Sequence, residues 1–149
     1  ALEFFLAYYR DHMLDNTQLY PGVKGALDRL LASGEKMAVL TNKPVRFSRA
    51  IVQGLGVGDH FFQIYGGNSF EQKKPDPIGI ETLLLESGAS RERTIMVGDS
   101  GVDIRTARNA NVRACGVSYG FQPEGFREDP PDILVDDMNE LADYVLVKP

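Results

Sequence analysis

Three short polar segments follow apolar runs in this chain, and their side chains could together bind a phosphoryl group. Thr41 and Asn42 offer a hydroxyl and an amide, Lys74 an ammonium, and Asp99 and Asp103 a pair of carboxylates. Lysine provides a point charge for phosphate, and carboxylate oxygens suit a hard divalent cation. The set therefore predicts a site that holds a phosphoryl group beside a cation.

The two carboxylates lie four positions apart, which would let both reach one cation. Asp99 would end a buried strand, and Asp103 would lie in the first turn of the following helix. Oxygen ligands of this kind favour Mg²⁺, which usually keeps several waters and shares phosphate oxygens. The alternative is structural, because Asp99 could cap the helix while the helix dipole favours Asp103.

The other site residues also have a functional and a structural interpretation. Thr41 and Asn42 could donate hydrogen bonds to phosphate oxygens, or either could cap a helix expected over 45–53. Lys74 precedes the stiff segment Pro75-Asp76-Pro77, which would fix its direction. It could instead be a solvated surface lysine. For each residue taken alone, both interpretations stay open.

Apolar periodicity indicates an α/β domain in which strands and helices alternate. We expect strands over 36–41, 61–65, 94–97, 113–117 and 133–135, and helices over 23–31, 45–53, 77–87, 101–110 and 138–146. This alternation is typical of βαβ units and a parallel sheet. Ligands of such sheets bind beyond the carboxyl ends of the strands, where the polar segments fall.

Composition narrows the classes of partner. With 16 Lys and Arg against 21 Asp and Glu, the net charge of −5 argues against broad nucleic-acid binding. The single cysteine, Cys115, lies in an apolar run and is expected to be a buried, inert thiol. No run is long enough to suggest a membrane span, and no leader pattern is evident, so we expect a cytoplasmic protein that does not associate with membranes.

The first residues carry a different pattern. Leu2, Phe5, Leu6, Tyr9 and Met13 recur at helical spacing and predict an amphipathic helix over 2–15. Its other face would carry Phe4 and Tyr8, more aromatic surface than a solvated helix needs. We therefore expect another segment or molecule to cover that face.

The ordered segments resemble the haloacid dehalogenase superfamily of phosphatases. Val39-Leu40-Thr41-Asn42 resembles its second motif, Lys74-Pro75 its third, and Gly98-Asp99 with Asp103 its fourth. Finer features, such as Gly66-Gly67-Asn68-Ser69, are similar to the phosphoglycolate phosphatase branch. The resemblance implies a three-layer, Rossmann-like parallel sheet. It also implies that residues 1–18 are a remnant of a helical cap domain, with 2–15 its last helix, and that 19–149 form the phosphatase core.

The resemblance further implies a mechanism for which this chain lacks one part. In the family an aspartate of an Asp-x-Asp-x-Thr motif attacks phosphorus, while Mg²⁺ and the lysine neutralise charge. No Asp-x-Asp occurs in this sequence, so we expect the chain to lack both the nucleophile and the central strand that bears it. Asp99 and Asp103 would bind the metal, Thr41, Asn42 and Lys74 the phosphate.

These features lead to one main hypothesis and three rivals. The main one is a Mg²⁺-dependent hydrolase of small phosphate monoesters, 2-phosphoglycolate first, whose activity belongs to a longer parent while this truncated chain is inactive alone. The rivals are a catalytically silent domain that binds phosphate or metal, an interaction or assembly domain, and a receiver-like signalling domain, which Lys74-Pro75 and the Thr41-Asn42 pair fit less well. A homo-oligomer could form through the exposed N-terminal helix or the missing-strand slot, since unpaired inner edges invite pairing.

Overall fold

Six parallel strands form one sheet in the computed structural model of this chain, which describes residues 5–8, 23–42, 45–54, 56, 58–72, 74–98, 101–118 and 126–147. The strands are β1 (Phe5–Tyr8), β2 (Lys36–Leu40), β3 (Gln63–Tyr65), β4 (Thr94–Gly98), β5 (Arg113–Val117) and β6 (Ile133–Val135). The helices are α1 (Val23–Ala32), α2 (Val45–Gly54), α3 (Ile78–Ser87), α4 (Gly101–Asn109) and α5 (Met138–Val147), with short 3₁₀ turns at Gly58–His60 and Arg91–Arg93.

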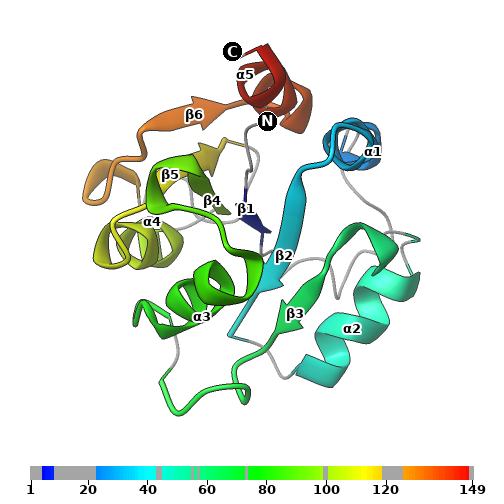
Figure 1. Ribbon diagram of the computed structural model, residues 1–149. Coiled ribbons are helices and arrows are strands. Elements are labelled where there is room, and N and C mark those ends of the chain that lie inside the picture. Colours follow the sequence, from blue (N-terminus) through cyan, green and yellow to red (C-terminus); the bar gives the residue numbers. More distant parts are fainter. Residues whose placement is uncertain are drawn as a thin grey trace.

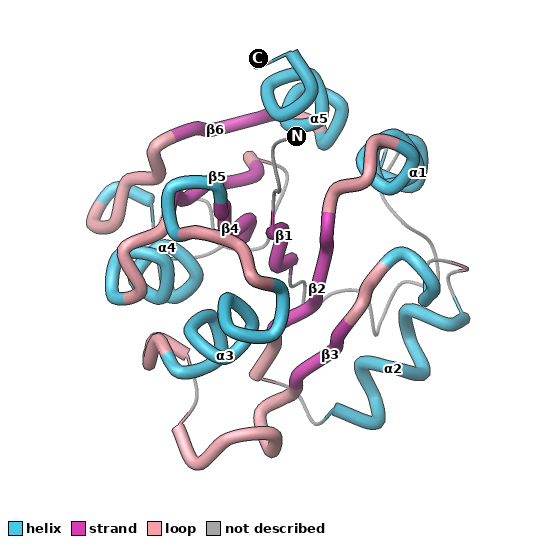
Figure 2. The backbone as a smooth tube through the Cα atoms, in the orientation of Figure 1, coloured by secondary structure: helices cyan, strands magenta, loops and turns pink. Residues whose placement is uncertain are grey.

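The strand order is β3-β2-β1-β4-β5-β6, and every neighbouring pair runs parallel (Figure 1). The predicted strands and helices from residue 23 onward are therefore confirmed, with small shifts at their ends. Because all the strands run parallel, their carboxyl ends share one edge of the sheet, and the described residues that follow them lie there. Figure 2 shows the alternation of strands and helices along the chain.

Helices cover both faces of this sheet, which gives three layers (Figure 1). Met37, Val39, Ile95 and Val97 of β2 and β4 pack with α1 and α5 on one face. The alternate residues of the same strands, such as Ala38 and Met96, pack with α3 and α4 on the other face. The period of two along each strand sends successive side chains to opposite faces. The central strands β2 and β4 are therefore largely apolar, as a doubly covered parallel sheet requires.

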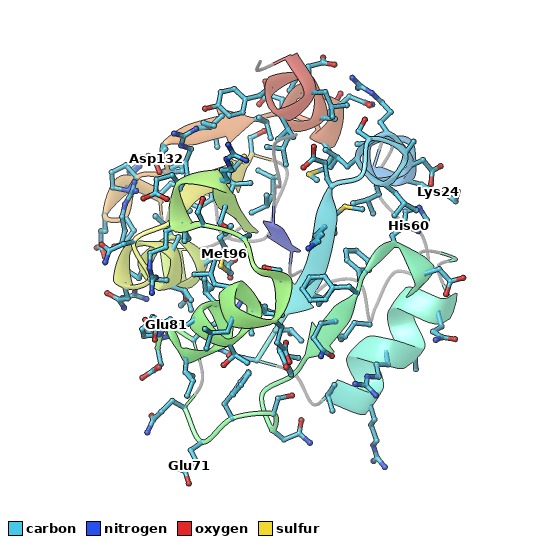
Figure 3. The ribbon with its side chains drawn as sticks, in the orientation of Figure 1. Lys24, His60, Glu71, Glu81, Met96 and Asp132 are labelled. Carbon is cyan, nitrogen blue, oxygen red and sulfur yellow. The ribbon has the colours of Figure 1, made fainter. Side chains whose placement is uncertain are left out.

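Ion pairs join elements at the periphery of the layers. Arg29 of α1 contacts Asp143 of α5 at 2.6 Å, and Arg108 of α4 contacts Asp132, just before β6, at 2.8 Å (Figure 3 labels Asp132). Burial alone would raise the pKa of Asp132, but hydrogen bonds from Arg108 and from the Ala114 N–H outweigh it and lower that pKa. No helix within the described residues has the length and apolarity needed to cross a bilayer.

The helix predicted over 2–15 is wrong at residues 5–8, because these residues form a strand. β1 pairs with β2 on one side, with Ala7 opposite Ala38, and with β4 on the other, with Ala7 opposite Met96. The rest of 2–15 lies outside the described residues. A four-residue apolar run suits either helix or strand, and here pairing on both sides satisfies the inner edges of β2 and β4.

The central strand that the sequence was expected to lack is thus present, supplied by residues 5–8. The slot between β2 and β4 is filled, so the predicted route to a homo-oligomer through an open slot does not apply to this structure. The assignment of residues 1–18 to a separate cap remnant is also corrected for 5–8, which belong to the core sheet. The boundary at residue 18 falls outside the described residues.

The central position of β1 makes a direct prediction for hydrogen exchange. The amides of residues 6–8 should exchange as slowly as those of residues 95–97 in β4, because a central strand is hydrogen-bonded on both sides. Deletion of residues 1–8 should abolish the cooperative thermal transition, whereas deletion of 148–149 should not. Exchange at residues 6–8 as fast as in an exposed loop would contradict the pairing.

Candidate functional site

The carboxyl end of β2 places the first two candidate residues. Thr41 follows β2 directly and is buried, and its backbone N–H donates to the carbonyl oxygen of Tyr65 at 3.1 Å. This bond extends the pairing with β3 one residue past the end of β2. Asn42 comes next and is half-buried. Both residues therefore lie at the edge of the sheet where ligands bind in folds of this kind.

Lys74 is buried, which contradicts its interpretation as a solvated surface lysine. Its side chain is 2% exposed, and its Nζ lies 2.5 Å from Oδ1 of Asp103. Its backbone N–H donates to Oδ1 of Asn42 at 3.0 Å, and its carbonyl accepts a longer contact of 3.4 Å from Asn42 Nδ2. The Lys74–Pro75 peptide bond is cis. The structure therefore brings Asn42, Lys74 and Asp103 into one connected group.

Asp103 lies in the first turn of α4 with its side chain fully buried. A Cβ added to Gly98, the last residue of β4, would lie 2.2 Å from Cβ of Asp103 and 2.3 Å from its Oδ2. Glycine is therefore needed at 98, because any larger residue would collide with the carboxylate. Asp99, the other predicted carboxylate, lies outside the described residues.

A small pocket opens beside this group, and Thr41, Asn42 and Lys74 all line it. The remaining lining residues come from the end of β2, the segment after β3, and the start of α3: Leu40, Gly66, Gly67, Phe70, Gln72, Asp76 and Gly79. All three residues predicted to bind phosphate thus line one pocket, together with the aromatic side chain of Phe70 and the polar side chains of Gln72 and Asp76.

Tyr65 supports the aromatic wall of this pocket. Its ring packs edge-on against Phe70 with centroids 4.8 Å apart, and its hydroxyl donates to the carboxylate of Glu86 at 2.7 Å. Partial burial, together with this carboxylate, raises the pKa of Tyr65 to about 12. The phenol consequently stays protonated, and continues to anchor β3 to α3, at any pH near neutrality.

Three further residues contribute to the site without having been predicted. Asn68 accepts a hydrogen bond from the Val45 N–H at 3.0 Å, so it caps α2, the role considered for Thr41 or Asn42. Asp76 accepts from the Ile78 N–H at 2.9 Å and so starts α3. Asn109 of α4 donates to the Pro75 carbonyl at 2.9 Å. The segment Asp76-Pro77 does carry a signal for a helix start, whereas the partners of Asn68 and Asn109 lie too far away in sequence to be read from it.

The electrostatics of the site rest on one lysine and one carboxylate that are both removed from water. Such a pair stays charged only when each partner compensates the other, since burial of a lone ion is costly. Among the described residues, no three His, Cys, Asp or Glu side chains are arranged to hold a metal. Asp103 therefore supplies one buried carboxylate, which suits Mg²⁺ because that ion commonly takes one or two carboxylates and completes its shell with water and phosphate oxygens.

Fold and site together describe a three-layer α/β protein in which a buried lysine and a buried carboxylate meet at the carboxyl edge of a parallel sheet. Residues 1–117 match the family model described as haloacid dehalogenase-like hydrolase. The chain belongs to this family.

Two similar curated relatives carry the same description. A phosphoglycolate phosphatase of Vibrio vulnificus is 36% identical over 148 residues, which cover 99% of this chain and 65% of that protein. A phosphoglycolate phosphatase of Pseudomonas fluorescens is 38% identical over 143 residues, covering 95% of this chain and 52% of its own length. The chain thus spans between about half and two thirds of these relatives.

Solved structures confirm the fold. A predicted phosphoglycolate phosphatase from Haemophilus somnus superimposes with a TM-score of 0.78 at 33% identity, over 87% of this chain and 56% of its own. A core domain from Streptococcus pneumoniae gives a TM-score of 0.75 over 99% of this chain and 98% of its own. That second likeness, at 21% identity, concerns the fold alone.

Gly98→Ala tests how tightly Asp103 is packed against the end of β4. The added methyl would meet Asp103 at 2.2 Å, so the variant should lose about 1–3 kcal/mol of unfolding free energy in urea denaturation. Gly25→Ala is the matched control, because a Cβ there meets nothing within 4 Å and the site is helical. It should leave stability unchanged or raise it by up to about 1 kcal/mol. Equal effects of the two changes would contradict the close packing.

The buried ion pair predicts strong coupling in a double-mutant cycle. Lys74→Met or Asp103→Leu alone should each cost about 3–5 kcal/mol, because each leaves a buried charge without its ion-pair partner. The double variant should lose much less than the sum of the two. Lys24→Met is the control, since Lys24 and Asp28 form an exposed pair at 3.2 Å that water screens, so its loss should change stability far less. Additive losses at 74 and 103 would argue against the pair.

Proposed function

We propose that this chain is the phosphate-binding core of a hydrolase that acts on small phosphate monoesters, with 2-phosphoglycolate the first substrate to test. One observation carries this proposal: Lys74 and Asp103 are buried together at the carboxyl edge of the sheet, next to Thr41 and Asn42. Relatives described as phosphoglycolate phosphatases support the choice of substrate. The pocket is lined by polar residues and by one aromatic ring, which suits a small anion with a short carbon chain.

The residues have separate roles in the proposed reaction. Thr41 would donate its hydroxyl hydrogen bond to a phosphate oxygen, and Asn42 would use a side-chain hydrogen for the same purpose. Lys74 would place positive charge beside the phosphoryl group, where negative charge develops as the ester bond breaks. Because Asp103 fixes the ammonium, little reorganisation would be needed when substrate binds.

We further propose Mg²⁺ as the cofactor, held by Asp99 and Asp103. Bound there, the ion would polarise the phosphoryl oxygens as a Lewis acid. The support within the described residues is Asp103, a fully buried carboxylate beside the strand end that precedes Asp99. The role of Asp103 would then be double, since it would orient Lys74 with one oxygen and face the cation from the same carboxylate.

The attacking group is the part that this chain does not identify. No Asp-x-Asp is present in the sequence, and the chain spans only part of its curated relatives. We therefore propose that hydrolysis belongs to a longer protein that carries this motif, and that the 149-residue chain binds phosphate without turning over substrate. A natural domain that binds phosphate or metal without catalysing a reaction would behave in the same way in isolation.

The deciding experiment measures binding and turnover separately. The chain is titrated with inorganic phosphate in the presence and absence of Mg²⁺ by NMR, and phosphate release from 2-phosphoglycolate is followed in parallel. We expect Mg²⁺-dependent phosphate binding, weakened at least tenfold in Asp99→Asn, and no release. Phosphate binding that is equally strong with and without Mg²⁺ would contradict the proposal that Mg²⁺ is the cofactor. Release that Asp99→Asn abolishes would overturn the claim that the nucleophile is missing.

A further inference from the structure

The side chain of Asn42 is bonded to the backbone of Lys74, a residue 32 positions away. Its Oδ1 accepts the Lys74 N–H at 3.0 Å, and its Nδ2 lies 3.4 Å from the Lys74 carbonyl. The amide group thus faces both backbone polar groups of one residue, as a neighbouring strand would. We propose that Asn42 is the positioning residue that fixes Lys74, and that it acts through the lysine backbone in addition to any contact with phosphate. This proposal rests on the phosphate-binding function argued above.

An asparagine between a strand and a helix would ordinarily cap that helix. Here the backbone N–H of Val45, the first residue of α2, donates to Oδ1 of Asn68 at 3.0 Å. The start of α2 is thus capped from another loop, and the Asn42 side chain is directed to Lys74 instead. An asparagine cap normally bonds backbone groups two or three residues farther along the chain, and Asn42 does not follow that pattern.

The consequence is that Lys74 is held at both of its ends. Asn42 contacts its backbone, and Asp103 contacts its Nζ at 2.5 Å, while Asn109 of α4 bonds the carbonyl of the following Pro75 at 2.9 Å. A lysine side chain has four rotatable bonds and large rotamer entropy, so its charge is placed only if both ends are fixed. The flexible lysine side chain could keep its contact with Asp103 while the loop shifted, whereas Asn42 ties the backbone of that loop to the end of β2.

Hydrogen exchange tests this clamp without any need for turnover. In the unmodified chain the Lys74 amide should be protected, although it lies in a loop. Asn42→Ala should speed exchange of that amide about fivefold or more relative to the Met96 amide in β4, the factor that loss of one hydrogen bond gives. Asn42→Asp keeps the Oδ1 acceptor and should keep the protection. Asn68→Ala is the control and should leave the Lys74 amide unchanged.

A second readout links the clamp to the site. In Asn42→Ala, binding of inorganic phosphate should weaken at least fivefold, and Asn42→Asp should not restore it, because the added charge repels the anion. An exposed-loop exchange rate for Lys74 in the unmodified chain would overturn the proposal even if Asn42→Ala failed to fold. Equal acceleration of all amides in Asn42→Ala would do so too, because that marks global destabilisation. A chain with the predicted exchange pattern that binds no phosphate would uphold the clamp and contradict the proposed function.

Discussion

The burial of one lysine against one aspartate is the constraint on which the rest of the site depends. Both side chains of the Lys74–Asp103 pair are removed from water, and such a pair gains stability only when its geometry is well fixed. Three segments supply that geometry. Asn42 lies beyond the end of β2, Lys74 lies in the loop before α3, and Asp103 lies in the first turn of α4. Gly98 is part of the same requirement, since only a residue without Cβ leaves room for the carboxylate.

The parallel sheet explains why these segments meet. The central strands β2 and β4 are covered on both faces and are largely apolar, so the polar chemistry lies beyond the ends of the strands. The helices that follow then set the direction of each loop. Asp76 starts α3 and Asn68 starts α2, and both therefore help to shape the pocket through the backbone. The wall formed by Phe70 is supported in turn by Tyr65, which is fixed to α3 through Glu86.

The sequence predicted most of the fold, because the strands and helices from residue 23 onward have clear periods and breaks. It also indicated the group formed by Thr41, Asn42, Lys74 and Asp103, since strand ends of a parallel sheet share an edge. It did not predict β1. Residues 5–8 carry an apolar run too short to separate helix from strand, and the arrangement was decided by the two unpaired inner edges of β2 and β4.

The hydrogen-bond partners of the asparagines were beyond prediction for a different reason. Asn42 and Asn68 each stand in a loop where local capping is the ordinary expectation. Their actual partners, Lys74 and Val45, lie 32 and 23 positions away. Only the packing of whole loops decides such a choice. The burial of Lys74 belongs to the same class, because the sequence Lys73-Lys74-Pro75 by itself resembles a solvated surface segment.

The position of β1 divides the sheet into two halves that meet at this one short strand. β3 and β2 form one half and carry Thr41, Asn42 and the Lys74 loop, while β4, β5 and β6 form the other and are followed by Asp103. The lysine–aspartate pair and the hydrogen bond from Asn109 to Pro75 therefore connect the two halves. An anion bound at this edge would hold both halves at once and should stabilise the fold by mass action. Binding of the ligand and the stability of the sheet are therefore coupled, because the same contacts serve both.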